Sequence, residues 1–128
     1  MIDADEVAAR DQTVDALRGA GARFAFVHGS RARRSHRTTS DLDVAAWWGG
    51  VVPASFEVDL PANVDLLVLN DAPLELIGRV AVDGVLLYDD DPTARVRWVA
   101  TTRKVYFDEL PRLRRAHAEY AESRHRGR

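Results

Sequence analysis

Three aspartates stand in apolar runs of the sequence, where charged side chains are unusual. Asp41 and Asp43 are separated by one residue in "DLDVAAW", and Asp65 lies in "VDLLVL". Side chains alternate between the two faces of a strand, so Asp41 and Asp43 would share a face and repel each other without a counterion. Mg²⁺ binds one or two carboxylates together with water and phosphate oxygens. The spacing therefore predicts a magnesium site at this pair, with Asp65 as a candidate third ligand.

A Gly-Ser pair, Gly29 and Ser30, directly follows the apolar run "RFAFVH". Glycine lets the chain turn tightly and approach a phosphate, while Ser30 offers a hydroxyl and a backbone N–H. A guanidinium group matches phosphate oxygens in a fork, which makes Arg31 and Arg33 candidates for neutralising a triphosphate. Each feature alone is typical of ordinary turns and solvated helix faces. Their combination with the aspartates favours a site for a nucleotide and Mg²⁺.

Helix and strand patterns alternate along the chain and suggest the elements that position these residues. Strands are predicted over residues 23–28, 41–47, 63–69 and 85–88, with a short extra strand at 56–60. Helices are predicted over 4–20 and 72–84 and from Asp91 onward, with a frayed tail at 122–128. The order predicts an α/β (α+β) fold, a small mixed sheet flanked by helices. The whole chain, 1–128, is expected to form a single domain.

The composition excludes several classes of protein. The 128 residues include no cysteine, so disulfides and thiolate metal sites are impossible. No apolar run approaches the roughly 20 residues that span a bilayer. The acidic start lacks the apolar core of a signal peptide, which predicts a cytoplasmic protein without a membrane partner. The net charge of −2 argues against direct binding to nucleic acid.

The segment "FVHGSRARRSHRTTSDLDVAAW" resembles the nucleotidyltransferase superfamily, in which a Gly-Ser precedes an Asp-x-Asp strand and a third acid follows in a later strand. It looks most like the minimal nucleotidyltransferase (MNT) subgroup. The segments "VDLLVLNDAPLELIGRVAVDGVLLYDDD" and "YFDELPRLRRAHAEY" are also similar to MNT antitoxins, which pair with HEPN-domain toxins. One departure is Arg34, because glycine is usual at this position of the family.

The resemblance implies a polymerase beta-like nucleotidyltransferase fold and the transfer of AMP from ATP to an acceptor hydroxyl. In the antitoxin subgroup the acceptor is a tyrosine of the HEPN ribonuclease toxin. A pair of Mg²⁺ ions would assist the transfer. The resemblance assigns catalysis and metal binding to Asp41, Asp43 and Asp65, and nucleotide binding to Gly29, Ser30, Arg31 and Arg33.

Two other functions stay open at this point. The chain could be a non-catalytic antitoxin that neutralises its toxin by complex formation alone, although the three aspartates speak against this. It could also be a small-molecule nucleotidyltransferase of the aminoglycoside-modifying type, although 128 residues leave no room for a substrate domain. An adjacent reading frame encoding a HEPN protein would favour the antitoxin over the small-molecule enzyme.

Overall fold

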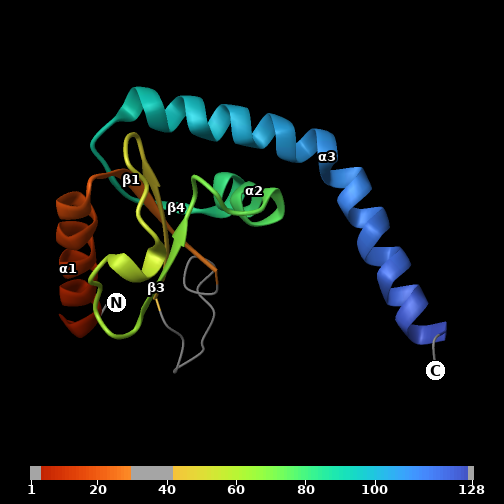
Figure 1. Cartoon of the computed structure of the whole chain (residues 1–128), viewed down its shortest axis with the longest axis horizontal. Helices are drawn as coiled ribbons and strands as arrows, with labels where there is room; N and C mark the ends of the chain where they lie inside the picture. The colour runs from red at the N-terminus through yellow and green to blue at the C-terminus, as the bar shows by residue number, and fades with distance from the viewer. Residues whose placement is uncertain (1–3, 30–41, 127–128) are drawn as a thin grey trace.

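A computed structural model of the chain describes residues 4–29 and 42–126 (Figure 1). The elements follow in the order α1 (Ala4–Ala20), β1 (Ala22–His28), β2 (Leu42–Trp48), η1 (Ser55–Glu57), β3 (Val64–Val68), α2 (Leu74–Asp83), β4 (Val85–Asp89) and α3 (Pro92–Arg126). The four strands form one sheet in the order β3-β2-β1-β4. β2 and β3 are parallel, whereas β1 runs antiparallel to both β2 and β4. The predicted mixed sheet flanked by helices is confirmed.

Helices cover both faces of the sheet, α1 on one side and α2 with α3 on the other (Figure 1). The central strand β1 is apolar at almost every position because both of its faces are buried. Its Ala25 and Val27 pack with Leu17 of α1. Its Phe24 and Phe26 point the other way, where Trp98 of α3 packs against them. The apolar core thus fixes the central strands from both sides.

The acidic triplet Asp89–Asp91, which begins at the last residue of β4, secures the start of α3. Asp91 accepts a hydrogen bond from the backbone N–H of Ala94 at 3.1 Å and pairs with Arg23 at 2.9 Å. These two donors hold the pKa of the Asp91 carboxyl below its usual value. Asp90 pairs in the same way with Arg18 of α1 at 2.8 Å. The triplet therefore ties the start of α3 to β1 and α1.

The two helices on one face approach each other closely at Gly78. The ring of Tyr106 in α3 lies where a Cβ atom at Gly78 would stand. Gly78 is buried in the middle of α2, and Arg103 of α3 donates a hydrogen bond to the carbonyl of Ala81 at 2.7 Å. The absence of a side chain at Gly78 is thus a requirement of this helix contact.

Gly78→Ala is expected to destabilise the protein by about 1–3 kcal/mol, because the new methyl group overpacks the contact with Tyr106. The measurement is the free energy of unfolding from a denaturant titration. Gly19→Ala in α1 is the control, since no atom lies within 4 Å of its new Cβ, and a helical alanine there should stabilise by up to ~1 kcal/mol. Equal stability of the two variants would show that the ring moves aside without cost.

One sequence prediction about local structure differs from the observed fold. The predicted strand at 56–60 is wrong, since η1 occupies Ser55–Glu57 as a 3₁₀ turn. There the Glu57 carboxylate accepts a hydrogen bond from the Ala54 N–H at 2.7 Å, which closes the turn locally. α3 is described to Arg126 and contains Pro111, and the fraying of the tail at 122–128 stays a prediction.

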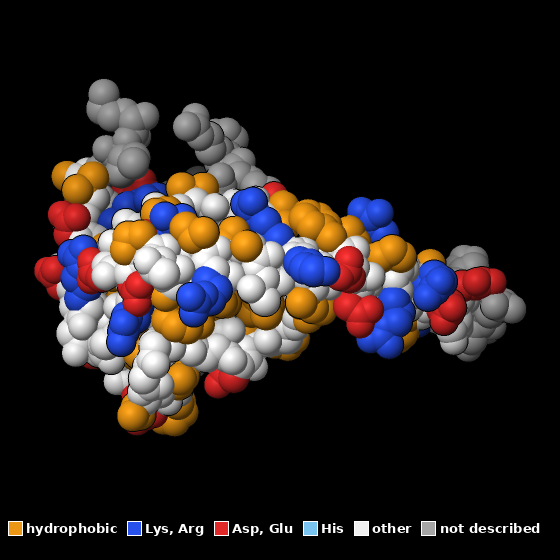
Figure 2. All heavy atoms as spheres, turned by 90° about the horizontal axis from the view of Figure 1, so that it is seen from above, with side chains coloured by type: hydrophobic (Ala, Val, Ile, Leu, Met, Phe, Trp, Pro, Cys, Tyr) orange, Lys and Arg blue, Asp and Glu red, His pale blue; other side chains and the backbone are white. Residues whose placement is uncertain are grey.

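The second half of α3 extends beyond the sheet (Figure 1). Figure 2 shows basic, acidic and apolar side chains interspersed along the face that this helix presents. At the start of this half, the imidazole of His117 lies 3.1 Å from the Glu75 carboxylate of α2. In the part of the chain that the structure describes, none of the helices is both long and apolar enough to cross a bilayer.

Candidate functional site

Two of the predicted acidic residues lie next to each other in the sheet. Asp43 of β2 and Asp65 of β3 are register partners in the parallel pair. Neighbouring strands are about 4.8 Å apart, and partners in register project to the same side. That side is the one covered by α2 and α3, because Trp47 and Leu67, which share a face with the aspartates, pack there. Both carboxylates stand at the beginning of their strands.

The surroundings of the two carboxylates differ. Asp43 is half-buried, since β2 is an inner strand of the sheet. Asp65 is exposed, because β3 is an edge strand. The site therefore combines one carboxylate that is partly buried in the sheet with one that is open to solvent.

The turn after β1 lies directly against Asp43. Gly29 has φ +75°, a conformation that side chains rarely adopt, and a Cβ atom there would stand 2.5 Å from Asp43 Oδ2. The cause is the antiparallel pairing of β1 with β2, which places His28 opposite Asp43. Two features thus require glycine at residue 29, the positive φ of its backbone and the close approach of the Asp43 carboxylate.

His28 also belongs to this cluster, although the sequence did not predict it as a site residue. Its side chain is partly buried, and burial lowers the pKa of the imidazole, an effect that the Asp43 charge opposes. The imidazole is therefore neutral at pH 7. The signal in the sequence was its place directly before Gly29 at the end of an apolar run, where a side chain can pack against the turn and orient it.

The other predicted site residues, Ser30, Arg31, Arg33 and Asp41, lie outside the described residues, as does Arg34. Over residues 4–29 and 42–126, no group of three or more histidine or acidic side chains could hold a metal ion. Asp43 and Asp65 nevertheless fit Mg²⁺, which binds proteins through one or two carboxylates and leaves its other positions to water and phosphate. Asp41 remains the predicted third ligand.

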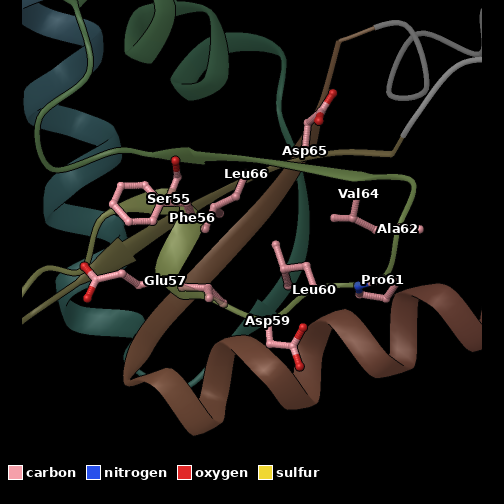
Figure 3. Close-up of a pocket in the computed structure, with 11 residues that line it drawn as sticks. Ser55, Phe56, Glu57, Asp59, Leu60, Pro61, Ala62, Val64, Asp65 and Leu66 are labelled. Atoms are coloured by element: carbon pink, nitrogen blue, oxygen red, sulfur yellow. The ribbon is translucent and has the colours of Figure 1, made fainter.

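A hollow of about 640 Å³ runs along the outer edge of β3, next to Asp65 (Figure 3). Its wall consists of the segment around η1 and the first half of β3, residues 55–62 and 64–66. Figure 3 shows Asp65 pointing away from Leu60 and Pro61 across the strand. Asp65 thus lines the hollow, while its carboxylate points to the other side of β3.

The fold and part of the sequence match known proteins. Residues 15–93, more than half of the chain, match the family described as Polymerase beta, Nucleotidyltransferase. Among curated proteins, no sequence matches.

Solved structures with the same fold come from toxin–antitoxin complexes. One is a toxin–antitoxin with AMP-PNP, at 20% identity and TM-score 0.70, with 88% of this chain and 98% of that chain covered. A second is a tri-AMPylated HEPN toxin of Shewanella oneidensis in complex with an MNT antitoxin, at 18% identity, TM-score 0.68 and coverages of 91% and 98%. A third is the toxin–antitoxin MntA-HepT, at 17% identity, TM-score 0.63 and coverages of 91% and 98%.

The family match covers β1 to β4 and thus includes both described aspartates and the Gly29 turn. The structural matches extend the agreement in fold to most of α3. The resemblance noted in the sequence is therefore confirmed at the level of the family, and the chain belongs to the polymerase beta nucleotidyltransferase family.

Proposed function

We propose that the chain is an antitoxin that transfers AMP from ATP to a tyrosine hydroxyl of a cognate HEPN-domain toxin. The observation that carries this proposal is the pairing of Asp43 with Asp65 in parallel register, with the Gly29 turn against Asp43. Solved complexes with the same fold support the proposed nucleotide and partner. One is a toxin–antitoxin with AMP-PNP, and another is a tri-AMPylated HEPN toxin in complex with an MNT antitoxin. Such a partner, an RNA-cleaving enzyme, would place the chain in the cytoplasm.

The proposed reaction is a displacement at the α-phosphorus of ATP. The tyrosine oxygen forms a bond to this phosphorus, the bond to the bridging oxygen of the β-phosphate breaks, and pyrophosphate leaves. Asp65 is the candidate base that accepts the tyrosine proton, because its exposed carboxylate can be reached by a protein acceptor. Mg²⁺ at Asp41, Asp43 and Asp65 would polarise the phosphate oxygens and neutralise developing charge.

The remaining site residues would hold the nucleotide. Gly29 lets the backbone approach the β- and γ-phosphates, and Ser30 offers them a hydroxyl and an N–H. Arg31 and Arg33 would balance the charge of the triphosphate as it becomes pyrophosphate. Asp43, half-buried and flanked by Gly29 and His28, would keep a fixed position relative to these groups.

The test is to incubate the chain with ATP, Mg²⁺ and the HEPN protein encoded in the adjacent reading frame, and to weigh the HEPN protein intact. We expect its mass to rise by one or more whole AMP units, each attached to tyrosine in a peptide map. The rise should disappear when Mg²⁺ is chelated, and the HEPN protein should lose ribonuclease activity as it is modified.

The alternative is neutralisation by binding alone. In that case the mass of the HEPN protein would stay unchanged, and its ribonuclease activity would fall in proportion to complex formation, with or without ATP. This result would overturn the proposed AMP transfer but agree with a role as an antitoxin. Modification of a small molecule but not of the HEPN protein would overturn both the proposed AMP transfer to the toxin and the role as an antitoxin.

A further inference from the structure

An aromatic side chain stands almost fully exposed on the η1 turn. Phe56 is 88% exposed. The turn that presents it is braced on both sides, because Glu57 donates its N–H to the carbonyl of Ala54 at 3.0 Å and accepts the Ala54 N–H at 2.7 Å. A rigid aromatic side chain loses little conformational entropy on binding, and such residues often anchor protein interfaces. Phe56 is therefore suited to contact another molecule.

Phe56 stands between two hollows along β3. The first, of about 640 Å³, is the one that reaches Asp65 (Figure 3). The second, of about 360 Å³, continues along β3 to residues 71–73. Ser55, Phe56 and Leu66 line both. Together they form one surface, which we call the β3 edge surface, defined by residues 53–62, 64–68 and 71–73.

The backbone of β3 offers hydrogen-bonding groups to this surface. Leu42 donates to the carbonyl of Asn63 and Leu69 donates to the carbonyl of Ala46, so the odd-numbered residues of this stretch bond to β2. The N–H and C=O groups of Leu66 and Val68 consequently point away from β2. In the described residues no strand pairs with that side of β3. An unpaired edge of this kind can bind an extended segment of another chain.

The charges of the β3 edge surface are of one sign. Its lining contains Glu57, Asp59, Asp65 and Asp71, and it contains no lysine or arginine. An extended segment that binds there should carry basic residues as well as apolar ones. Acidic residues in the segment would be repelled by the carboxylates of the surface, whereas basic residues would speed association with it. Apolar side chains would meet Phe56 and Leu66.

We propose that the β3 edge surface docks the toxin segment that carries the acceptor tyrosine, an extended segment with apolar and basic side chains. This inference rests on the proposed function and adds how the acceptor is recognised. The position of Asp65 supports it, because Asp65 lines the hollow while its exposed carboxylate points to the other side of β3. Successive side chains of an extended segment paired with β3 would point to alternate faces, so that some meet Phe56 and Leu66 and others face the carboxylate of Asp65.

The first test compares Phe56→Ser with Val51→Ser. Val51 is 94% exposed in the same connection between β2 and β3 but lines neither hollow, which makes it a matched control. We expect Phe56→Ser to weaken binding of the HEPN toxin and to raise the KM for the toxin, each by about 10- to 30-fold, because an interface anchor is lost. Its kcat and its affinity for Mg-ATP should stay unchanged. Val51→Ser should stay within about twofold of the parent.

The second test addresses charge. Asp59→Arg should slow association with the toxin at low salt and lose this effect at high salt, where charges are screened. Asp11→Arg, an identical change of charge at an exposed position of α1, is the control and should leave the rate near that of the parent. Rates are measured by stopped-flow fluorescence with labelled toxin.

Toxin affinity is measured without ATP, so docking is tested whether or not transfer occurs. Absence of transfer by the parent would contradict the proposed function alone. Parent-like toxin affinity in both Phe56→Ser and Asp59→Arg would overturn the docking surface. The docking surface would also be overturned if the parent chain formed dimers in solution that Phe56→Ser dissociated, because the surface would then be a contact between copies of this chain.

Discussion

Asp43→Asn is expected to lower the rate of AMP transfer by at least about 100-fold. Even substitution of a residue that only hydrogen-bonds to a metal ligand costs 10–100-fold in metal affinity or activity. The fold should persist, since Asp43 and Asp65 are adjacent carboxylates and removal of one charge relieves their repulsion. Transfer is measured from initial rates with saturating toxin, and Mg-ATP affinity is measured by calorimetry. We expect both to fall while the melting temperature stays equal or rises.

The control for this prediction is Asp11→Asn, which removes a carboxylate from the exposed surface of α1. It should leave transfer and Mg-ATP binding unchanged. If Asp43→Asn still bound ATP with undiminished dependence on Mg²⁺, Asp43 would not belong to the metal site. A lower melting temperature would indicate instead that the carboxylate has a structural role in the sheet.

Gly29→Ala is expected to reduce transfer by roughly 100-fold, which is the effect of displacing a catalytic group by about 1 Å. A methyl group at residue 29 would overlap Asp43 Oδ2, and the backbone has φ +75°, where a side chain costs about 1–2 kcal/mol. The turn, the carboxylate or both must therefore move. The loss should exceed that of Ser30→Ala, which removes one hydroxyl and leaves the backbone free to approach phosphate.

Gly50→Ala is the matched control, because no atom lies within 4 Å of its new Cβ. It should retain parental transfer and stability. Initial rates at saturating Mg-ATP and thermal melts of the three variants separate loss of function from loss of fold. Full transfer by Gly29→Ala would show that the turn after β1 is an ordinary turn without a part in the site.

The order of helices and strands could be predicted from the sequence because each main element has a clear period and clear ends. β1 is an apolar run closed by Gly29, and α3 begins at a Pro92 that follows the capping Asp91. The segment 56–60 was misread because a short apolar stretch alone does not distinguish a strand from a turn. There the hydrogen bond from the Ala54 N–H to the Glu57 carboxylate stabilises a 3₁₀ turn instead of a strand.

The candidate site was predictable in its residue types but not in its geometry. The sequence indicated that Asp43 and Asp65 share a site, yet their register depends on how β2 pairs with β3, and a slip of one residue would place them on opposite faces. The expected reason for Gly29 was approach to phosphate, whereas the structure adds its contact with Asp43. The exposure of Phe56 depends on the whole fold and could not be predicted from the order of residues alone.

The parallel pairing of β2 with β3 has a consequence for how such a domain can diversify. The distance between Asp43 and Asp65 is set by main-chain hydrogen bonds between the strands, not by the connection that joins them. That connection, residues 49–63, can thus change in length and sequence during evolution without moving either carboxylate, since surface loops tolerate insertions. Much of the proposed docking surface lies in this connection, whereas the two proposed metal-binding carboxylates lie in the strands, so the docking surface can change while the carboxylates keep their positions.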